Sequence, residues 1–193
     1  MQMTLTHLMD RWSIRRRQFD GRPETLDALY ACPDPWKLGA RELGRFEATN
    51  ALIAQHCGRP ASVLEVGCGE GYQTRYFSGF ADHVTGLDIS ATALQRAQAA
   101  VPRAQFLIGE LPDLRGSLPR HRYDLVTLCE VLAYGNGQER LLAAAQGCGD
   151  RVLATVYEPQ SYAIEHHLSR PGWRELTSIR AGRKRWRTWL WSS

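Results

Sequence analysis

Residues 63–74 read VLEVGCGEGYQT, and this stretch decides the fold. An apolar run typical of a buried strand leads into three glycines at alternate positions, and a helical pattern follows. Glycine adopts the unusual dihedrals that such a turn needs and lets a ligand approach the backbone without a Cβ in the way. The exposed amides at the helix start favour an anionic group such as a carboxylate. The stretch therefore predicts a strand–loop–helix unit that binds a ligand.

The spacing of the glycines argues against a nicotinamide or flavin enzyme. The dinucleotide fingerprint G-x-G-x-x-G requires Gly or Ala at position 72, but this chain has Tyr72 there and its third glycine one residue earlier, at Gly71. Asp88 ends the next predicted strand. Its two carboxylate oxygens are placed to accept both ribose hydroxyls of a nucleoside.

Strand-like runs alternate with helical patterns after residue 61. We expect strands at 62–67, 83–89, 106–110, 123–130 and 151–158, and helices at 74–79, 91–100 and 138–147. This alternation predicts a parallel sheet with crossover helices. Near the end the period changes to two, in Trp173–Arg180 and Lys184–Trp191 around the turn residues 181–183, which predicts an antiparallel hairpin.

The first 61 residues lack strand signals. Apolar residues recur at helical spacing from Leu43 to Ile53, and Pro33-Asp34-Pro35-Trp36 predicts a loop. We expect a helical cap over residues 1–61 that covers an α/β core over residues 62–193, together a single domain.

Composition excludes several classes of protein. With 193 residues, 44% of them hydrophobic and 23% charged, the chain is not disordered or fibrous. It has no apolar run near the ~20 residues that span a bilayer. Residues 1–10 show no apolar signal segment, so we expect a cytoplasmic protein. The five cysteines form no C-x-x-C pair, which favours reduced thiols over a structural zinc site.

Positive charge gathers at the end of the chain. Residues 170–193 hold seven basic residues and one acid, hence a net charge of +6, while the other 17 basic and 19 acidic residues give −2. Basic residues beside tryptophans are typical of a nucleic-acid surface. They are equally typical of an edge hairpin whose tryptophans pack while its arginines stay in water. We expect no nucleic-acid partner, because no basic track continues the patch.

Four segments, VLEVGCGEG, GLDIS, FLIGELP and YDLVTLCEVL, together resemble the successive motifs of class I S-adenosylmethionine-dependent methyltransferases over about residues 62–158. The resemblance implies an α/β, Rossmann-like sheet of seven strands, mostly parallel, with an antiparallel C-terminal hairpin and helices on both faces. It implies S-adenosylmethionine as the cofactor and S-adenosylhomocysteine as the product. The preceding segment PDPWKLGARELGRFEATNALIA is similar to the nodulation N-methyltransferases of the NodS type.

The resemblance also implies the site residues. The glycines would hold the methionine part of the cofactor, Asp88 the ribose, and Glu110 would lie near the adenine. The full expected cofactor-binding set is Glu65, Gly67, Cys68, Gly69, Gly71, Asp88, Ile89, Glu110, Leu111 and Cys129, and the expected substrate pocket contains Tyr30, Trp36 and Tyr134.

The catalytic candidates are Glu130, His166 and His167. Glu130 follows the fourth predicted strand, on the side where open α/β sheets bind ligands, and it either orients the substrate and accepts a proton or is a surface carboxylate. The histidines either act in catalysis or belong to a solvated helix face. A metal site there is not expected, because adjacent side chains on a helix diverge and no third ligand is evident.

We expect methyl transfer to a small-molecule acceptor, with an amino sugar or another saccharide-like amine or hydroxyl as the candidate class. RNA or protein methylation is the alternative within enzymes, and a catalytically silent cofactor-binding partner subunit is the alternative outside them. No membrane partner is expected. The sequence leaves open whether N, O or C is methylated, and it leaves open the oligomeric state.

Overall fold

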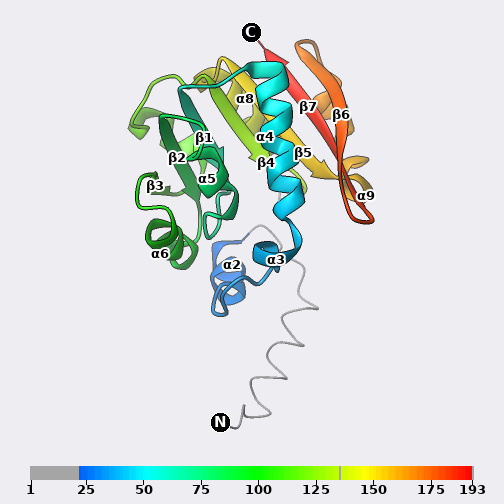
Figure 1. Ribbon diagram of the computed structural model, residues 1–193. Helices are drawn as coiled ribbons and strands as arrows, with labels where there is room; N and C mark the ends of the chain where they lie inside the picture. The colour runs from blue at the N-terminus through cyan, green and yellow to red at the C-terminus, as the bar shows by residue number, and fades with distance from the viewer. Residues whose placement is uncertain (1–21, 135, 193) are drawn as a thin grey trace.

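The computed structural model describes residues 22–134 and 136–192, so the expectation for residues 1–10 lies outside the described residues. The elements follow one another along the chain as drawn in Figure 1. They are α2 (Pro23–Leu29), α3 (Leu38–Arg41), α4 (Leu43–Cys57), β1 (Ser62–Val66), α5 (Tyr72–Phe77), β2 (His83–Asp88), α6 (Ala91–Ala100), β3 (Gln105–Ile108), α7 (Leu111–Leu114), the short 3-10 helix η1 (Arg115–Ser117), β4 (Leu125–Cys129), α8 (Gln138–Cys148), β5 (Arg151–Tyr157), α9 (Glu158–Ser161), α10 (Glu165–Leu168), β6 (Trp173–Ala181) and β7 (Lys184–Ser192).

The strands form a seven-stranded sheet in the order β3-β2-β1-β4-β5-β7-β6. Strands β1 to β5 pair in parallel, and β7 runs antiparallel to both of its neighbours, β5 and β6. The chain proceeds from β1 to one edge through β2 and β3, and then returns to the other side of β1 as β4. Ligands in open α/β sheets bind at such a switch point, outside the carboxyl ends of the strands.

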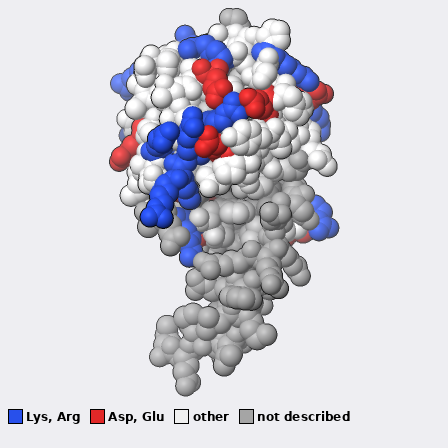
Figure 2. Space-filling model, turned by 90° about the vertical axis from the view of Figure 1, so that its right-hand side faces the viewer, with Lys and Arg blue, Asp and Glu red and all other residues white. Residues whose placement is uncertain are grey.

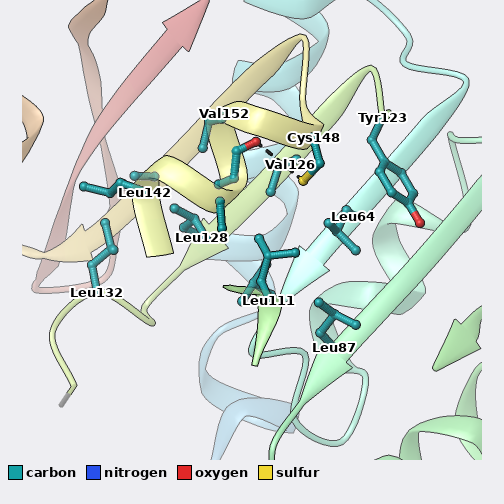
Figure 3. Close-up of a cluster of buried hydrophobic side chains, with 14 of the residues drawn as sticks. Leu64, Leu87, Leu111, Tyr123, Val126, Leu128, Leu132, Leu142, Cys148 and Val152 are labelled. Atoms are coloured by element: carbon teal, nitrogen blue, oxygen red, sulfur yellow. Dashed lines mark hydrogen bonds between the residues drawn. The ribbon is translucent and has the colours of Figure 1, made fainter. Parts of the chain in front are cut away.

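Helices cover both faces of this sheet. Successive side chains of a strand point to opposite faces. On β1, Val63 packs in one apolar cluster with Ile53 of α4 and Phe77 of α5. Leu64 packs in the opposite cluster with Leu142 of α8. Figure 3 shows this second cluster, in which side chains of α8 lie against those of the central strands. The expected two-sided α/β architecture is confirmed.

The C-terminal hairpin packs onto the sheet through its tryptophans. Trp186 and Trp189 of β7 are each 2% exposed, and they belong to different apolar clusters. The turn between β6 and β7 contains Gly182 at a φ of +58°. Because the rings of Trp186 and Trp189 are buried, they are not available to stack on bases, and the structure favours the edge-hairpin interpretation of this segment.

Several strands end earlier than the sequence predicts. Strand β1 ends at Val66 because Gly67 has a φ of +72°, and β3 ends at Ile108 before Gly109 with a φ of +131°. Strand β4 ends at Cys129 because Glu130 has a φ of 64°. A positive φ is not compatible with an extended strand. Each premature end therefore marks a turn at the carboxyl edge of the sheet.

Candidate functional site

A cavity of about 660 Å³ lies at the carboxyl ends of β1, β2 and β4, at the switch point of the sheet. This volume is within the range of small-molecule sites, ~300–1,000 Å³. The loop after β1 lines it, as do the ends of β2 and β4 and residues 109–112 after β3. The N-terminal helices and β7 complete the wall.

Nearly all of the predicted cofactor residues meet in this cavity. Its lining includes Glu65, Gly67, Cys68, Gly69, Asp88, Ile89, Glu110, Leu111 and Cys129. Gly71 is not among the lining residues. It has a φ of +80°, and a Cβ added there would lie 3.2 Å from the Cβ of Ala97. Gly71 therefore starts α5 and permits its close packing against α6.

At Gly67 the requirement for glycine comes from the protein itself. A Cβ at this position would lie 2.4 Å from Cγ2 of Val131, in addition to the unfavourable φ of +72°. The backbone N–H groups of Gly67 and Cys68 both donate to the carbonyl oxygen of Leu87, at 2.7 and 2.9 Å. Contact with Val131 is therefore a further reason for glycine at this position, and the approach of a ligand to the loop stays a prediction.

Asp88 lies at the end of β2 and is 7% exposed. Its Oδ2 accepts a hydrogen bond from the N–H of Gly69 at 2.8 Å, and its Oδ1 accepts one from the N–H of Ser90 at 2.9 Å. Burial raises the pKa of Asp88 although these N–H groups lower it. A carboxylate has about four lone-pair sites, so both oxygens retain capacity to accept hydroxyl groups from a ligand.

Glu65 faces the same cavity from β1. It is 3% exposed, and its Oε2 accepts a hydrogen bond from the Thr74 hydroxyl at 2.5 Å. Burial raises the pKa of Glu65 to about 8, and the Thr74 hydroxyl and the charge of Arg45 oppose this shift. The carboxyl group therefore protonates much more readily than that of an ordinary glutamate.

Glu130 lines the cavity just after β4, in the left-handed backbone region that only a few per cent of non-glycine residues adopt. Its Oε1 atom is buried and has no hydrogen-bond partner among the described residues. Burial raises the pKa of Glu130 to about 7. The charge of Arg45 and hydrogen bonds from the Trp186 side chain and the Tyr157 backbone oppose that shift. Glu130 therefore brings a carboxyl group with a pKa of about 7 to the lining of the cavity.

Aromatic side chains form the wall around Glu130. Trp36 and Tyr134 have ring centroids 6.1 Å apart, and Tyr157 and Trp186 have ring centroids 6.0 Å apart. All four residues line the cavity, as does Tyr30. The three residues expected in the substrate pocket, Tyr30, Trp36 and Tyr134, are thus brought together with the expected catalytic carboxylate.

The structure places His166 and His167 away from this cavity. They lie in α10 with ring centroids 3.9 Å apart, and neither is among the lining residues. Nδ1 of His167 is 3.9 Å from Oε1 of Glu139. Within residues 22–134 and 136–192, no group of three His, Cys, Asp or Glu side chains is arranged to hold a metal ion.

Sequence reasoning missed several polar residues of the site, and two of them, Arg45 and Gln73, are buried. Arg45 is 4% exposed, and its Nε donates to Oε2 of Glu42 at 3.0 Å, whereas its Nη1 has no partner among the described residues. Gln73 is 5% exposed, and both polar atoms of its amide lack partners in the described structure. An unsatisfied buried polar group costs ~1–3 kcal/mol. A cavity lined by these groups therefore fits a polar ligand that carries both donors and acceptors.

Comparison with known proteins shows that the central part of this chain resembles methyltransferases. A family model described as a methyltransferase domain matches residues 63–153. Nodulation protein S of Bradyrhizobium diazoefficiens is 27% identical over 117 residues. The matched part is 60% of this chain and 56% of that protein, so the chain spans little more than half the length of this relative.

Solved structures show the same fold. The N-methyltransferase NodS from Bradyrhizobium japonicum WM9, in complex with S-adenosyl-L-homocysteine, has a TM-score of 0.68 at 16% identity and covers 89% of this chain and 98% of its own. A putative RNA methyltransferase from Pyrococcus horikoshii has a TM-score of 0.62 at 14% identity, over 99% of this chain and 98% of its own. The fold is therefore shared with an N-methyltransferase and with a putative RNA methyltransferase, and it does not by itself identify an acceptor.

Proposed function

We propose that this chain is a class I S-adenosylmethionine-dependent methyltransferase, as its likeness to such enzymes supports, and that it transfers a methyl group to the amine of a small-molecule acceptor. An amino sugar is the first acceptor class to test. The observation that carries the proposal is the buried, unpartnered Oε1 of Glu130 in the cavity, on a carboxyl group with a pKa of about 7. The likeness to an N-methyltransferase supports an amine rather than a hydroxyl.

The described residues can hold the ribose and the amino-acid end of the cofactor. Asp88 accepts the ribose hydroxyls, as its buried position at the end of β2 suggests. The amino-acid end of the cofactor carries a carboxylate and an ammonium group. We assign the carboxylate to the unpartnered Nη1 of Arg45, and we assign a second contact at this end to the unpartnered amide of Gln73. When bound, S-adenosylmethionine supplies an electrophilic methyl group on a positively charged sulfur.

Glu130 receives the proton that the acceptor loses. With S-adenosylmethionine bound, Oε1 of Glu130 would take the proton from the acceptor nitrogen, and this nitrogen would then accept the methyl group that the cofactor supplies, with S-adenosylhomocysteine as the leaving group. A base with a pKa of about 7 suits an amine. An ordinary alkylammonium has a pKa of ~10.4, which is far below the pKa of an alcohol, so its proton is easier to remove. Alignment by the cavity contributes most of the acceleration, because positioning supplies up to ~7–11 kcal/mol.

The aromatic wall fits an acceptor that arrives as a cation. The rings of Trp36, Tyr134, Tyr157 and Trp186 all line the cavity around Glu130. A cation within ~6 Å of an aromatic ring face is stabilised by about 0.5–2 kcal/mol, most when it is desolvated. An ammonium group is therefore recognised by the rings before Glu130 accepts its proton.

The charges of the hairpin favour a small molecule over RNA. Figure 2 shows Lys and Arg side chains lying beside Asp and Glu on the face that contains β6 and β7. Arg187 contacts Glu165 and Glu175, each at 2.8 Å. Lys184 contacts Glu42 at 2.6 Å. These ion pairs reduce the positive charge that is left to contact phosphates, on which nucleic-acid affinity depends.

The test is release of S-adenosylhomocysteine from matched pairs of acceptors that differ in one group, such as D-glucosamine with D-glucose and benzylamine with benzyl alcohol. We expect product above background with at least one amine and with none of the alcohols. Turnover only with alcohols would contradict an amine acceptor, and turnover only with RNA or protein would contradict a small-molecule acceptor. Binding of the cofactor with no product from any acceptor would favour a silent partner subunit instead.

A further inference from the structure

Glu70 occupies an unusual position in the glycine loop. It stands between Gly69 and Gly71, yet it does not line the cavity. Its side chain is only 6% exposed. A buried carboxylate needs strong partners, because removal of a charge from water costs several kcal/mol. Those partners show what Glu70 does.

Both oxygens of Glu70 are used, and each has a different partner. Oε2 accepts a hydrogen bond from the backbone N–H of Asp34 at 2.8 Å. Oε1 accepts one from Nη1 of Arg96 at 2.7 Å, and the same Nη1 lies 3.5 Å from the carbonyl oxygen of Cys32. Glu70 thus connects the glycine loop to the segment before α3, both directly and through an arginine of α6.

This connection extends through residues 26–39, which we call the cap segment. Asp34, at a φ of 48°, accepts hydrogen bonds from the N–H groups of Leu38 at 2.6 Å and Gly39 at 3.1 Å. The cap segment also carries Tyr30 and Trp36 into the cavity wall. A second polar contact joins it to the core, where Ser90 donates to Asp27 at 2.5 Å.

The core partners of the cap segment lie beside the groups that bind the cofactor. Glu70 is adjacent to Gly69, whose N–H donates to Asp88, and Ser90 donates its own N–H to the same carboxylate. The Tyr30 hydroxyl lies over the loop, 2.7 Å from the position that a Cβ added to Gly69 would occupy. A ligand that fixes this loop and Asp88 therefore also fixes the anchors of the cap segment.

We propose that Glu70 is a positioning residue that couples cofactor binding to docking of the cap segment, and hence to completion of the acceptor pocket. The inference rests on the proposed function in naming the cofactor as the ligand. By thermodynamic linkage, the cofactor stabilises the docked cap segment by the same factor by which the docked segment strengthens cofactor binding.

The first test needs no ligand, and it is amide hydrogen exchange in three variants. Glu70→Ala removes both hydrogen bonds. Glu70→Gln keeps an oxygen for the Asp34 N–H and loses the charge that pairs with Arg96. Glu47→Gln changes an exposed carboxylate of α4 and is the control. We expect exchange at residues 34–39 to be about tenfold faster or more in Glu70→Ala, intermediate in Glu70→Gln and unchanged in Glu47→Gln.

Amides of β1 and β4, measured in the same experiment, report whether the core remains folded. Unchanged exchange of the cap segment in Glu70→Ala would overturn the proposal, whether or not the protein is a methyltransferase. If Glu70→Ala does not fold, the comparison of Glu70→Gln with the wild type decides.

The second test adds S-adenosylhomocysteine. In the wild type it should slow exchange of the cap segment by about 5–150-fold, the usual range of coupling between sites. In Glu70→Ala this response should be lost, and affinity for the ligand should fall by the same factor. An equal response in the wild type and Glu70→Ala would contradict the coupling. Wild-type protein that does not bind the ligand would instead contradict the proposed function.

Discussion

The Glu130→Gln variant should transfer methyl groups about 10²–10⁴-fold more slowly than the wild type at saturating cofactor, the usual contribution of a general base. Glutamine keeps the shape of the side chain and can still accept hydrogen bonds from Trp186 and the Tyr157 backbone, but it cannot take a proton. The loss should therefore appear in the maximal rate, while cofactor affinity changes little. The measurement is initial rate of S-adenosylhomocysteine release with the best amine acceptor.

The pH dependence of the wild-type rate is a second test of the role of Glu130. Glu130 acts as a base only when it is ionised, and its pKa is about 7. The rate should therefore rise as pH increases through about 7 and then level off. In Glu130→Gln the inflection near pH 7 should disappear, and in the control Glu47→Gln it should stay. Retention of both rate and inflection in Glu130→Gln would exclude this carboxylate as the proton acceptor.

The Asp88→Ala variant should lose most of its affinity for the cofactor. A hydrogen bond to a charged group contributes ~1.5–3 kcal/mol, so loss of one weakens binding roughly 10- to 150-fold, and loss of two weakens it further. Calorimetric titration with S-adenosylhomocysteine measures the effect. Asp88 also accepts hydrogen bonds from Gly69 and Ser90, so the loop itself loses support in this variant.

Two controls separate these contributions. Asp88→Asn retains an oxygen for part of the network and should bind with intermediate affinity. Asp82→Asn changes a carboxylate whose side chain is 61% exposed, in an ion pair with Arg59, and it should bind as the wild type does. Full affinity in Asp88→Ala, with a melting temperature equal to that of the wild type, would show that this residue does not hold the ribose.

The sequence predicted those features that a local pattern encodes. Alternating strands and helices gave the parallel part of the sheet, and period-two segments gave the hairpin of β6 and β7. The glycine loop and Asp88 are close in sequence to the strands that position them, so nearly all of the residues expected to bind the cofactor line the cavity, and their contact with the cofactor stays a prediction. Strand ends were misplaced where a positive φ, as at Glu130, interrupts an apolar run.

The other part of the site depends on contacts between distant segments. Arg45 lies among apolar residues of α4 at helical spacing, and no motif distinguishes it from a surface arginine. Its burial results from packing against Phe46 and Trp186, whose ring centroids lie 4.7 and 5.7 Å from its guanidinium carbon. Trp186 reaches Glu130 only because β7 pairs with β5, Tyr157 opposite Trp186. Glu130 directly follows β4, but His166 and His167 lie in α10, separated from the end of β5 by α9, and they are not among the residues that line the cavity.

One calorimetric experiment tests the central claim most directly, that the cavity at the switch point of the sheet binds S-adenosylmethionine. The wild-type protein is titrated with S-adenosylhomocysteine and, separately, with NADH. The account predicts saturable binding of one S-adenosylhomocysteine per chain and no binding of NADH, because Tyr72 and Gly71 break the dinucleotide spacing. Binding of NADH without binding of S-adenosylhomocysteine would contradict it.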